Sequence, residues 1–108
     1  MKITKNFTTD EMQCPCCGEC NMDKEYMEAL QDVRTTCEFG FKVNSAYRCS
    51  KYNAKVSKNT RGQHSTGEAV DISMKDRYKR FKLLKEAIEC GYFKDIAISG
   101  TFIHLGKG

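Results

Sequence analysis

Two segments with helical periodicity provide the framework for any fold of this chain. One covers about residues 23–37 and the other about residues 76–90, and Gly40 and Gly91 follow them as stop signals. The apolar stripes are Tyr26, Met27, Leu30, Val33 and Cys37 in the first segment, and Tyr78, Phe81, Leu84 and Ile88, joined by Leu83 and Ala87, in the second. Spacings of three and four residues place each set on one face, so the pattern predicts two main amphipathic helices.

Shorter segments between and after these helices favour strands. They are residues 41–47, 68–73, 95–98 and 102–105, and Ser99-Gly100 is a tight-turn signal between the last two. Residues 50–56 favour a short helix, residues 57–67 a loop, and residues 1–22 an irregular segment with one helical turn after Thr8 or Thr9. This order predicts an α+β fold in which a small, mostly antiparallel sheet accompanies the two helices.

The size and composition of the chain indicate one ordinary domain. With 108 residues, we expect a single domain over 1–108, on which a cysteine-rich segment, 1–22, packs. Apolar residues make up 40% and charged residues 30%, which argues against disorder. The net charge of +4 favours anionic partners such as nucleic acid or an anionic cell wall, although a solvated surface without a partner explains it equally well.

The N-terminal residues contain no apolar stretch of the kind found in secretory signals. No apolar run approaches the ~20 residues that a membrane helix needs. We therefore expect cytoplasmic synthesis without a signal peptide and no insertion into a membrane.

Seven cysteines are present, and four of them crowd together near the N-terminus as Cys14, Cys16, Cys17 and Cys20. An odd number and a reducing compartment disfavour disulfides. The C-x-x-C spacings suit a structural zinc site, completed by all four thiolates or by a partner such as Cys37 or Cys49. The alternative is that these are reduced thiols packed against the core.

The chain contains two histidines, and both lie where a site can form. His64 precedes the strand that carries Asp71, and His104 lies in the last strand, pointing away from Ile103 and Leu105. Two imidazoles and one carboxylate are a common ligand set for catalytic zinc, which leaves a fourth position for water. Spacing alone also allows packed, hydrogen-bonded histidines, so the pattern predicts a candidate zinc site.

Local motifs extend this pattern to a family. Residues 62–72, GQHSTGEAVDI, resemble the Ser-x-His-x-x-Gly-x-Ala-x-Asp signature of zinc D-Ala-D-Ala carboxypeptidases and related phage endolysins. Residues 44–49, NSAYRC, are similar to the Ser-Gly-Tyr-Arg segment of that family, and residues 102–105 resemble its strand with the third ligand. The opening, from Asn6 through 14–18, CPCCG, looks like that of short phage-type members. The chain is identified as a short member of this family, which implies a hedgehog/DD-peptidase-like fold.

The resemblance implies specific roles. His64, Asp71 and His104 would hold one catalytic zinc ion, and Arg48 would bind a substrate carbonyl or carboxylate, with a structural salt bridge as the alternative. Gly67 and Ala69 would be small because the backbone turns tightly there and must leave room for metal and substrate. The implied activity is hydrolysis of peptidoglycan peptides by metal-activated water, as a carboxypeptidase or an endopeptidase. We expect a monomer, encoded by a phage or prophage, that acts on the cell wall after its release.

The general base does not follow the family pattern. Its usual positions hold other residues here, and these are Thr101, Phe102 and Gly106. Gly62 also replaces the signature serine. The remaining candidates are Asp95, which starts a neighbouring strand and which we predict to act in catalysis, and Glu68, which strand alternation turns away from Asp71. Either could equally be a solvated carboxylate.

Two other classes of function remain open at this stage. One is a non-catalytic zinc module of the same fold, as in the hedgehog signalling domain, which a missing base would fit. The other is a nucleic-acid-binding zinc knuckle over residues 14–20. No aromatic-rich basic stripe accompanies those cysteines, so we expect no specific nucleic acid partner.

Overall fold

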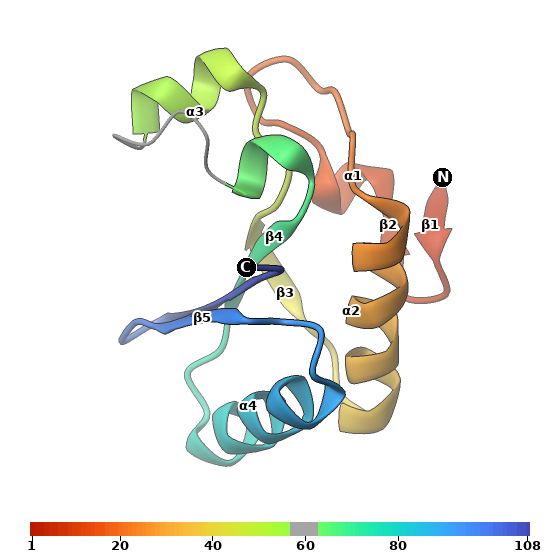
Figure 1. Cartoon of the computed structure of the whole chain (residues 1–108), viewed down its shortest axis with the longest axis vertical. Coiled ribbons are helices and arrows are strands. Elements are labelled where there is room, and N and C mark those ends of the chain that lie inside the picture. The colour runs from red at the N-terminus through yellow and green to blue at the C-terminus, as the bar shows by residue number, and fades with distance from the viewer. Residues whose placement is uncertain (57–62) are drawn as a thin grey trace.

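A computed structural model describes residues 1–56 and 63–108 of the chain (Figure 1). The helices are α1 (Thr9–Met12), α2 (Lys24–Cys37), α3 (Ser50–Val56) and α4 (Arg77–Cys90), with a 3₁₀ turn, η1 (Gln63–Thr66). The strands are β1 (Lys2–Thr4), β2 (Phe7–Thr8), β3 (Lys42–Ser45), β4 (Ala69–Ser73), β5 (Asp95–Ile98) and β6 (Phe102–Gly106). Gly62 and the first part of the predicted loop 57–67 lie outside the described residues.

The main sheet contains four antiparallel strands in the order β3-β4-β6-β5. The last two strands form the predicted hairpin, in which the Ser99 N–H donates to the Phe102 carbonyl at 2.9 Å. The prediction of an α+β fold with two main helices and an antiparallel sheet is confirmed. The separate two-stranded sheet β1-β2 was not predicted, because strands this short show no periodicity.

Helix α2 follows its prediction closely. The Asp23 side chain accepts a hydrogen bond from the Tyr26 N–H at 2.9 Å and so caps the N-terminus. The predicted apolar stripe is buried in the core cluster. Burial of each large apolar side chain contributes about 1.5–3 kcal/mol. The helix ends at Cys37, as predicted, and Glu38, with a φ of 63° in the left-handed conformation, caps it two residues before Gly40.

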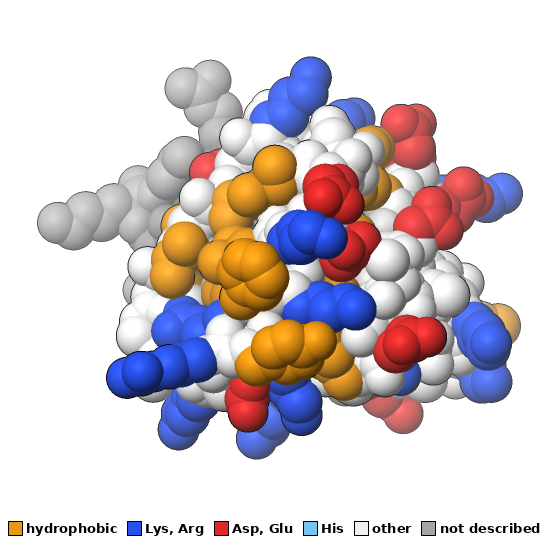
Figure 2. All heavy atoms as spheres, turned by 90° about the horizontal axis from the view of Figure 1, so that it is seen from below, with side chains coloured by type: hydrophobic (Ala, Val, Ile, Leu, Met, Phe, Trp, Pro, Cys, Tyr) orange, Lys and Arg blue, Asp and Glu red, His pale blue; other side chains and the backbone are white. Residues whose placement is uncertain are grey.

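Helix α4 buries only part of the apolar face predicted for it, and Leu84 of that face packs partly buried against the core. Leu83 and Ala87 are fully buried, whereas Tyr78, Phe81 and Ile88 are 64–69% exposed. Two apolar stripes lie next to each other on this helix, and the side with the small Ala87 is the one that packs into the core it shares with α2. Apolar side chains accordingly gather among Lys and Arg side chains on the face seen from below (Figure 2).

The N-terminal segment is tied to the rest of the fold by caps and core contacts. Thr8 and Glu11 form a capping box at the start of α1, where we predicted a helical turn. Phe7 and Met12 belong to the hydrophobic core, and the Tyr47 N–H donates to the Met12 carbonyl at 3.0 Å. The segment therefore packs against the residues that follow β3.

The two faces of the main sheet have different environments. Val70 and Ile72 of β4 and Ile103 and Leu105 of β6 are fully buried in the core shared with α2 and α4. The alternate residues of these strands face the opposite way. None of the described helices is long and apolar enough to cross a membrane.

Candidate metal centre

Strand register places Asp71 and His104 side by side. They are direct partners in the β4·β6 ladder, and both face away from the hydrophobic core. His104 Nδ1 lies 2.7 Å from Asp71 Oδ1. The sequence prediction that His104 points away from Ile103 and Leu105 is confirmed, since those two residues are fully buried and His104 is only half-buried.

His64 reaches the same point from outside the sheet. It lies in η1, and its Nδ1 is 2.7 Å from the Ala46 carbonyl oxygen. Since a carbonyl oxygen only accepts hydrogen bonds, we assign the proton to Nδ1, which leaves a lone pair on Nε2. That Nε2 atom lies 3.4 Å from Asp71 Oδ1. A hydrogen bond on the other ring nitrogen is the usual way that a metal-binding histidine is oriented.

The three side chains fit the demands of a zinc ion. One ligand atom from each of His64, Asp71 and His104 lies within 4.8 Å of the others. Zinc holds nitrogen and oxygen ligands at about 2.0–2.2 Å, so such ligands must lie within about 4.4 Å of one another. The distances from Asp71 Oδ1 to His104 Nδ1, 2.7 Å, and to His64 Nε2, 3.4 Å, lie within that limit. The structure thus brings together the three residues that we predicted as ligands.

The close contacts among these side chains shift the pKa values of Asp71 and His104. Burial alone would raise the pKa of Asp71, but hydrogen bonds with His104 and His64 outweigh burial and hold that pKa well below its usual range. The hydrogen bond to Asp71 raises the pKa of His104, with a further contribution from the charge of Asp95. A carboxylate that stays ionised in a largely buried position is a suitable partner for a cation.

Arg48 lies at the edge of the cluster and is held by several contacts. Its Nη2 is 3.7 Å from Asp71 Oδ2. Its Nε donates to Ser45 Oγ at 3.0 Å, and its Nη1 donates to Asn53 Oδ1 at 3.4 Å. Ser45 pairs with Asp71 across β3 and β4. The role of Ser45 in holding Arg48 was missed, because alternation in the segment 41–47 places Ser45 on the face of Phe41 and Val43, and the register shift between Val43 and Ser45 that turns it toward Asp71 has no sequence period.

Asp95 lies on the far side of the His104 ring from Asp71. Its Oδ2 atom is 3.5 Å from His104 Nε2, and its side chain is about half exposed. Glu68 instead pairs with Lys107 at 3.2 Å and accepts a hydrogen bond from Thr66. Asp95 is not one of the predicted ligands. Among the described residues, it is the further carboxylate that makes an ion-pair contact with the cluster.

Gly67 owes its small size to the N-terminal segment rather than to metal or substrate. Its φ is +75°, and a Cβ atom would lie 2.1 Å from the Asn21 carbonyl oxygen. The Asp23 N–H donates to the Gly67 carbonyl at 2.9 Å. The backbone before α2 therefore packs directly on the turn that links His64 to β4.

The cysteine cluster corresponds to the alternative in which a partner from outside residues 14–20 joins the predicted cysteines. Cys14 and Cys17 lie together with Cys49, whereas Cys16 is exposed and Cys20 packs against the core. Burial would raise the pKa of Cys14, but backbone N–H groups, led by that of Cys49, lower it to about 7. The Glu19 N–H lowers the pKa of Cys17, yet burial and the neighbouring thiols outweigh it and raise that pKa to about 11.

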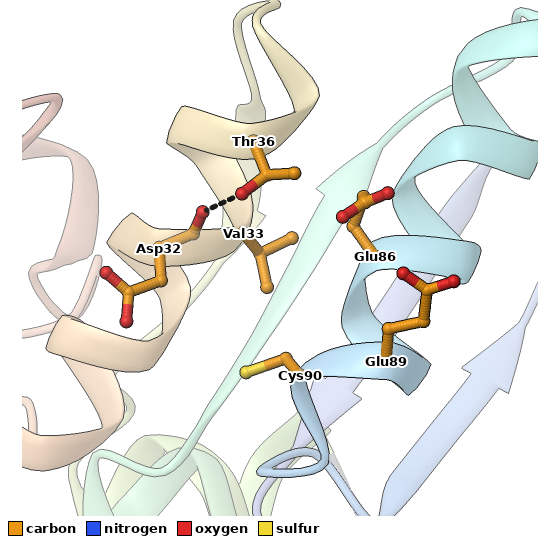
Figure 3. A pocket seen from close by; sticks show the side chains of 6 residues that line it. All are labelled: Asp32, Val33, Thr36, Glu86, Glu89 and Cys90. Carbon is orange, nitrogen blue, oxygen red and sulfur yellow. Dashed lines mark hydrogen bonds between the residues drawn. The ribbon is translucent and has the colours of Figure 1, made fainter.

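A separate groove lies between α2 and α4, on the opposite side of the sheet from Asp71 and His104. Its volume is about 370 Å³, and its lining residues are Asp32, Val33, Thr36, Glu86, Glu89 and Cys90 (Figure 3). Lys85 pairs with both Glu86 and Glu89 there. The groove contains no part of the histidine cluster, so we do not assign it to the candidate metal centre.

Comparison with known proteins places the chain in a family. The model of the family described as Peptidase M15 matches residues 5–106, and the chain belongs to this family of metallopeptidases. Among solved structures, the chain is similar to the L-Ala D-Glu endopeptidase ChiX of Serratia marcescens, with 16% identity and a TM-score of 0.55. The match covers 82% of this chain and 81% of that one, and it supports the fold. No match is found among curated proteins.

Proposed function

We propose that this protein is a zinc-dependent peptidase that hydrolyses peptide bonds of bacterial peptidoglycan. The observation that carries the proposal is the convergence of His64, Asp71 and His104, whose ligand atoms lie within 4.8 Å of one another. These residues come from η1, β4 and β6. A hydrogen bond with the Ala46 carbonyl orients the His64 ring, and Asp95 contacts the outer nitrogen of the His104 ring. A family of metallopeptidases supplies the class of reaction.

A zinc ion held by these residues would polarise the scissile carbonyl and would make a water molecule acidic enough to attack it. The histidines and Asp71 contribute two neutral nitrogen donors and one anionic oxygen, which leaves room for a further ligand. The protein's part is to hold the rings, and the Ala46 carbonyl does this for His64.

Arg48 and Asp95 flank the cluster and are the residues we propose to assist the reaction. The Arg48 guanidinium, fixed by Ser45 and Asn53, supplies a positive charge next to Asp71. It would stabilise negative charge on the substrate carbonyl oxygen or bind a substrate carboxylate. Asp95 contacts the outer nitrogen of His104, so this contact supports an orienting role, and the proton transfer that we predicted for Asp95 stays a prediction.

Peptide cross-bridges and stems of peptidoglycan are the substrates we propose. The structural relative named as an L-Ala D-Glu endopeptidase makes this bond the first one to test. The net charge of +4 would favour residence on an anionic cell wall.

The test is incubation of the zinc-loaded protein with purified peptidoglycan. We expect new free amino groups, and mass spectrometry of the released peptides identifies the bond. His104→Ala is the matched loss-of-ligand variant, and circular dichroism must show that it retains the fold. Full zinc occupancy without new amino groups would instead support a non-catalytic zinc module of the same fold, which the residues at Thr101, Phe102 and Gly106 favour because none is a carboxylate.

A further inference from the structure

Three sulfur atoms from two distant parts of the chain meet beside the candidate metal centre. One Sγ atom from each of Cys14, Cys17 and Cys49 lies within 4.8 Å of the others. Cys14 and Cys17 belong to the loop between α1 and α2, and Cys49 lies between β3 and α3. All the cysteines are free thiols in the structure, so no disulfide explains this convergence.

The loop that carries Cys14 and Cys17 is a closed turn built to place two sulfurs on one side. The Gly18 N–H donates to the Cys14 carbonyl at 2.8 Å, and the Cys14 N–H donates to the Glu19 carbonyl at 2.7 Å. Gly18 has a φ of +75°, a conformation that glycine adopts without strain. The turn therefore holds the C-x-x-C pair rigidly, at a spacing common in zinc sites.

Backbone N–H groups point at these sulfurs. The Cys49 N–H donates to Cys14 Sγ at 3.4 Å, and the Tyr52 N–H donates to Cys49 Sγ at 3.4 Å. Further backbone hydrogen bonds reach Cys14 from Cys16 and Cys17. Donors of this kind stabilise the thiolate form, which is the form that binds metals.

We propose that Cys14, Cys17 and Cys49 form a second metal site that binds zinc through three thiolates. Zinc holds sulfur ligands at about 2.3 Å, so the sulfurs of one site must lie within about 4.6 Å of each other, close to the observed limit. Soft thiolate donors select zinc over magnesium or calcium. Binding releases the thiol protons to solvent, and the exposed side of Cys17 leaves the fourth position to a ligand from solvent.

This site would join the N-terminal segment to the segment that carries Arg48. Cys49 follows Arg48 directly, and the Arg48 N–H donates to the His64 carbonyl at 3.0 Å. The hydrogen bond from the Tyr47 N–H to the Met12 carbonyl joins the same two segments of the chain, and it needs no metal. The role of the site would be to hold these two segments together, and it goes beyond the proposed function because it needs neither the histidine cluster nor hydrolysis.

The first experiment is elemental analysis of zinc in purified variants. We expect about two zinc ions per chain in the wild type and about one in both Cys49→Ser and His104→Ala, because each change removes one site. Cys90→Ser is the matched control, since Cys90 is an exposed cysteine outside the cluster, and it should keep the wild-type content. Equal zinc content in Cys49→Ser and the wild type would overturn the proposal.

A second experiment uses the wild-type protein, so it does not depend on the folding of a variant. Cys16 and Cys17 are neighbours and both are exposed, which makes them a matched pair for alkylation mapped by mass spectrometry. Zinc should slow alkylation of Cys17 by about tenfold or more and leave Cys16 unchanged, because a coordinated thiolate is a poorer nucleophile. A chelator should reverse the effect.

Two results of this second experiment would contradict the proposal. One is an alkylation rate at Cys17 that does not respond to zinc. The other is a disulfide among Cys14, Cys17 and Cys49 in protein whose thiols were blocked at cell lysis. Failure of the hydrolysis assay would not bear on either result, so the two proposals can fail separately.

Discussion

Asp71 and His104 occupy paired strands, whereas His64 and Arg48 occupy segments outside the sheet. The first pair is placed by the ladder between β4 and β6, where the two residues are direct partners. The second pair is placed by a few contacts, from His64 to the Ala46 carbonyl, from Arg48 to Ser45 and Asn53, and between the backbones of Arg48 and His64. We call Asp71 and His104 the strand half of the candidate metal centre, and His64 and Arg48 its loop half.

The two halves should differ in how they tolerate change. A sheet ladder distributes positional control over many backbone hydrogen bonds, so one substitution moves it little. A loop residue is held by a few side-chain contacts, so each of them controls a larger share of its position than one bond of a ladder does. Asp71 joins the halves, because it contacts His104, His64 and Arg48.

Asp71→Asn should have the largest effect, since it acts on both halves at once. The amide keeps the size of the side chain but removes the negative charge that the cation and both rings require. Replacing the outer partners of metal ligands costs about 10–100-fold in metal affinity, so loss of the ligand itself should exceed this and abolish hydrolysis. Competition with a chromophoric chelator measures the affinity.

Asp32→Asn is the control for this prediction. Asp32 lies in the groove between α2 and α4, away from the histidine cluster. It should bind zinc like the wild type. Wild-type zinc affinity in Asp71→Asn would remove Asp71 from the ligand set and with it the division into two halves.

Gly67→Ala should have the next largest effect. It acts on the loop half alone, because Gly67 lies in the turn that links His64 to β4. A left-handed φ costs about 1–2 kcal/mol for alanine, and overpacking against Asn21 adds about 1–3 kcal/mol. Urea unfolding of the metal-free protein should therefore show a loss of about 2–5 kcal/mol. Gly100→Ala is the control, because nothing lies within 4 Å of its Cβ position. A similar small loss in both variants would show that the N-terminal segment does not press on this turn.

The fold was predictable where periodicity and caps agree. The bounds of α2 and the last hairpin followed from apolar spacing and turn residues. The buried side of α4 was not predictable, because the exposed residues Tyr78, Phe81 and Ile88 have the same helical spacing as a core stripe. Only the packing partner decides which stripe is buried, and that choice depends on tertiary contacts that no local pattern contains.

The strand half of the site was also more predictable than the loop half. The alternation of side chains along a strand predicted that His104 faces away from the core. Asp71 and His104 lie in two segments predicted as strands, so they could be strand partners. The proximity of Cys49 to Cys14, and the contact of Ser45 with Arg48, depend on how a loop folds back on another element. Such contacts have no sequence period, so only the resemblance to a family pointed to Arg48.

Asp95→Asn tests the outer support of the strand half. If the carboxylate orients His104, its loss should weaken zinc binding by about 10–100-fold. If Asp95 instead transfers protons, kcat should fall while zinc affinity stays unchanged. Glu89→Gln is the control, since Glu89 is an exposed carboxylate in the groove on the other side of the sheet. Unchanged affinity and kcat would leave Asp95 without either role.

Ser45→Ala should have the smallest effect, because it removes one of several contacts that hold Arg48. The Nε hydrogen bond at 3.0 Å is lost, while Asn53 and Asp71 still contact the guanidinium. A single hydrogen bond contributes about 0.5–1.5 kcal/mol, so kcat/KM should fall by about 2–10-fold with zinc content unchanged. Ser73→Ala, at the C-terminal end of β4, is the control. A drop in zinc content with Ser45→Ala would mean that the loop half positions the metal ligands as well as Arg48, and that the division between the halves lies elsewhere.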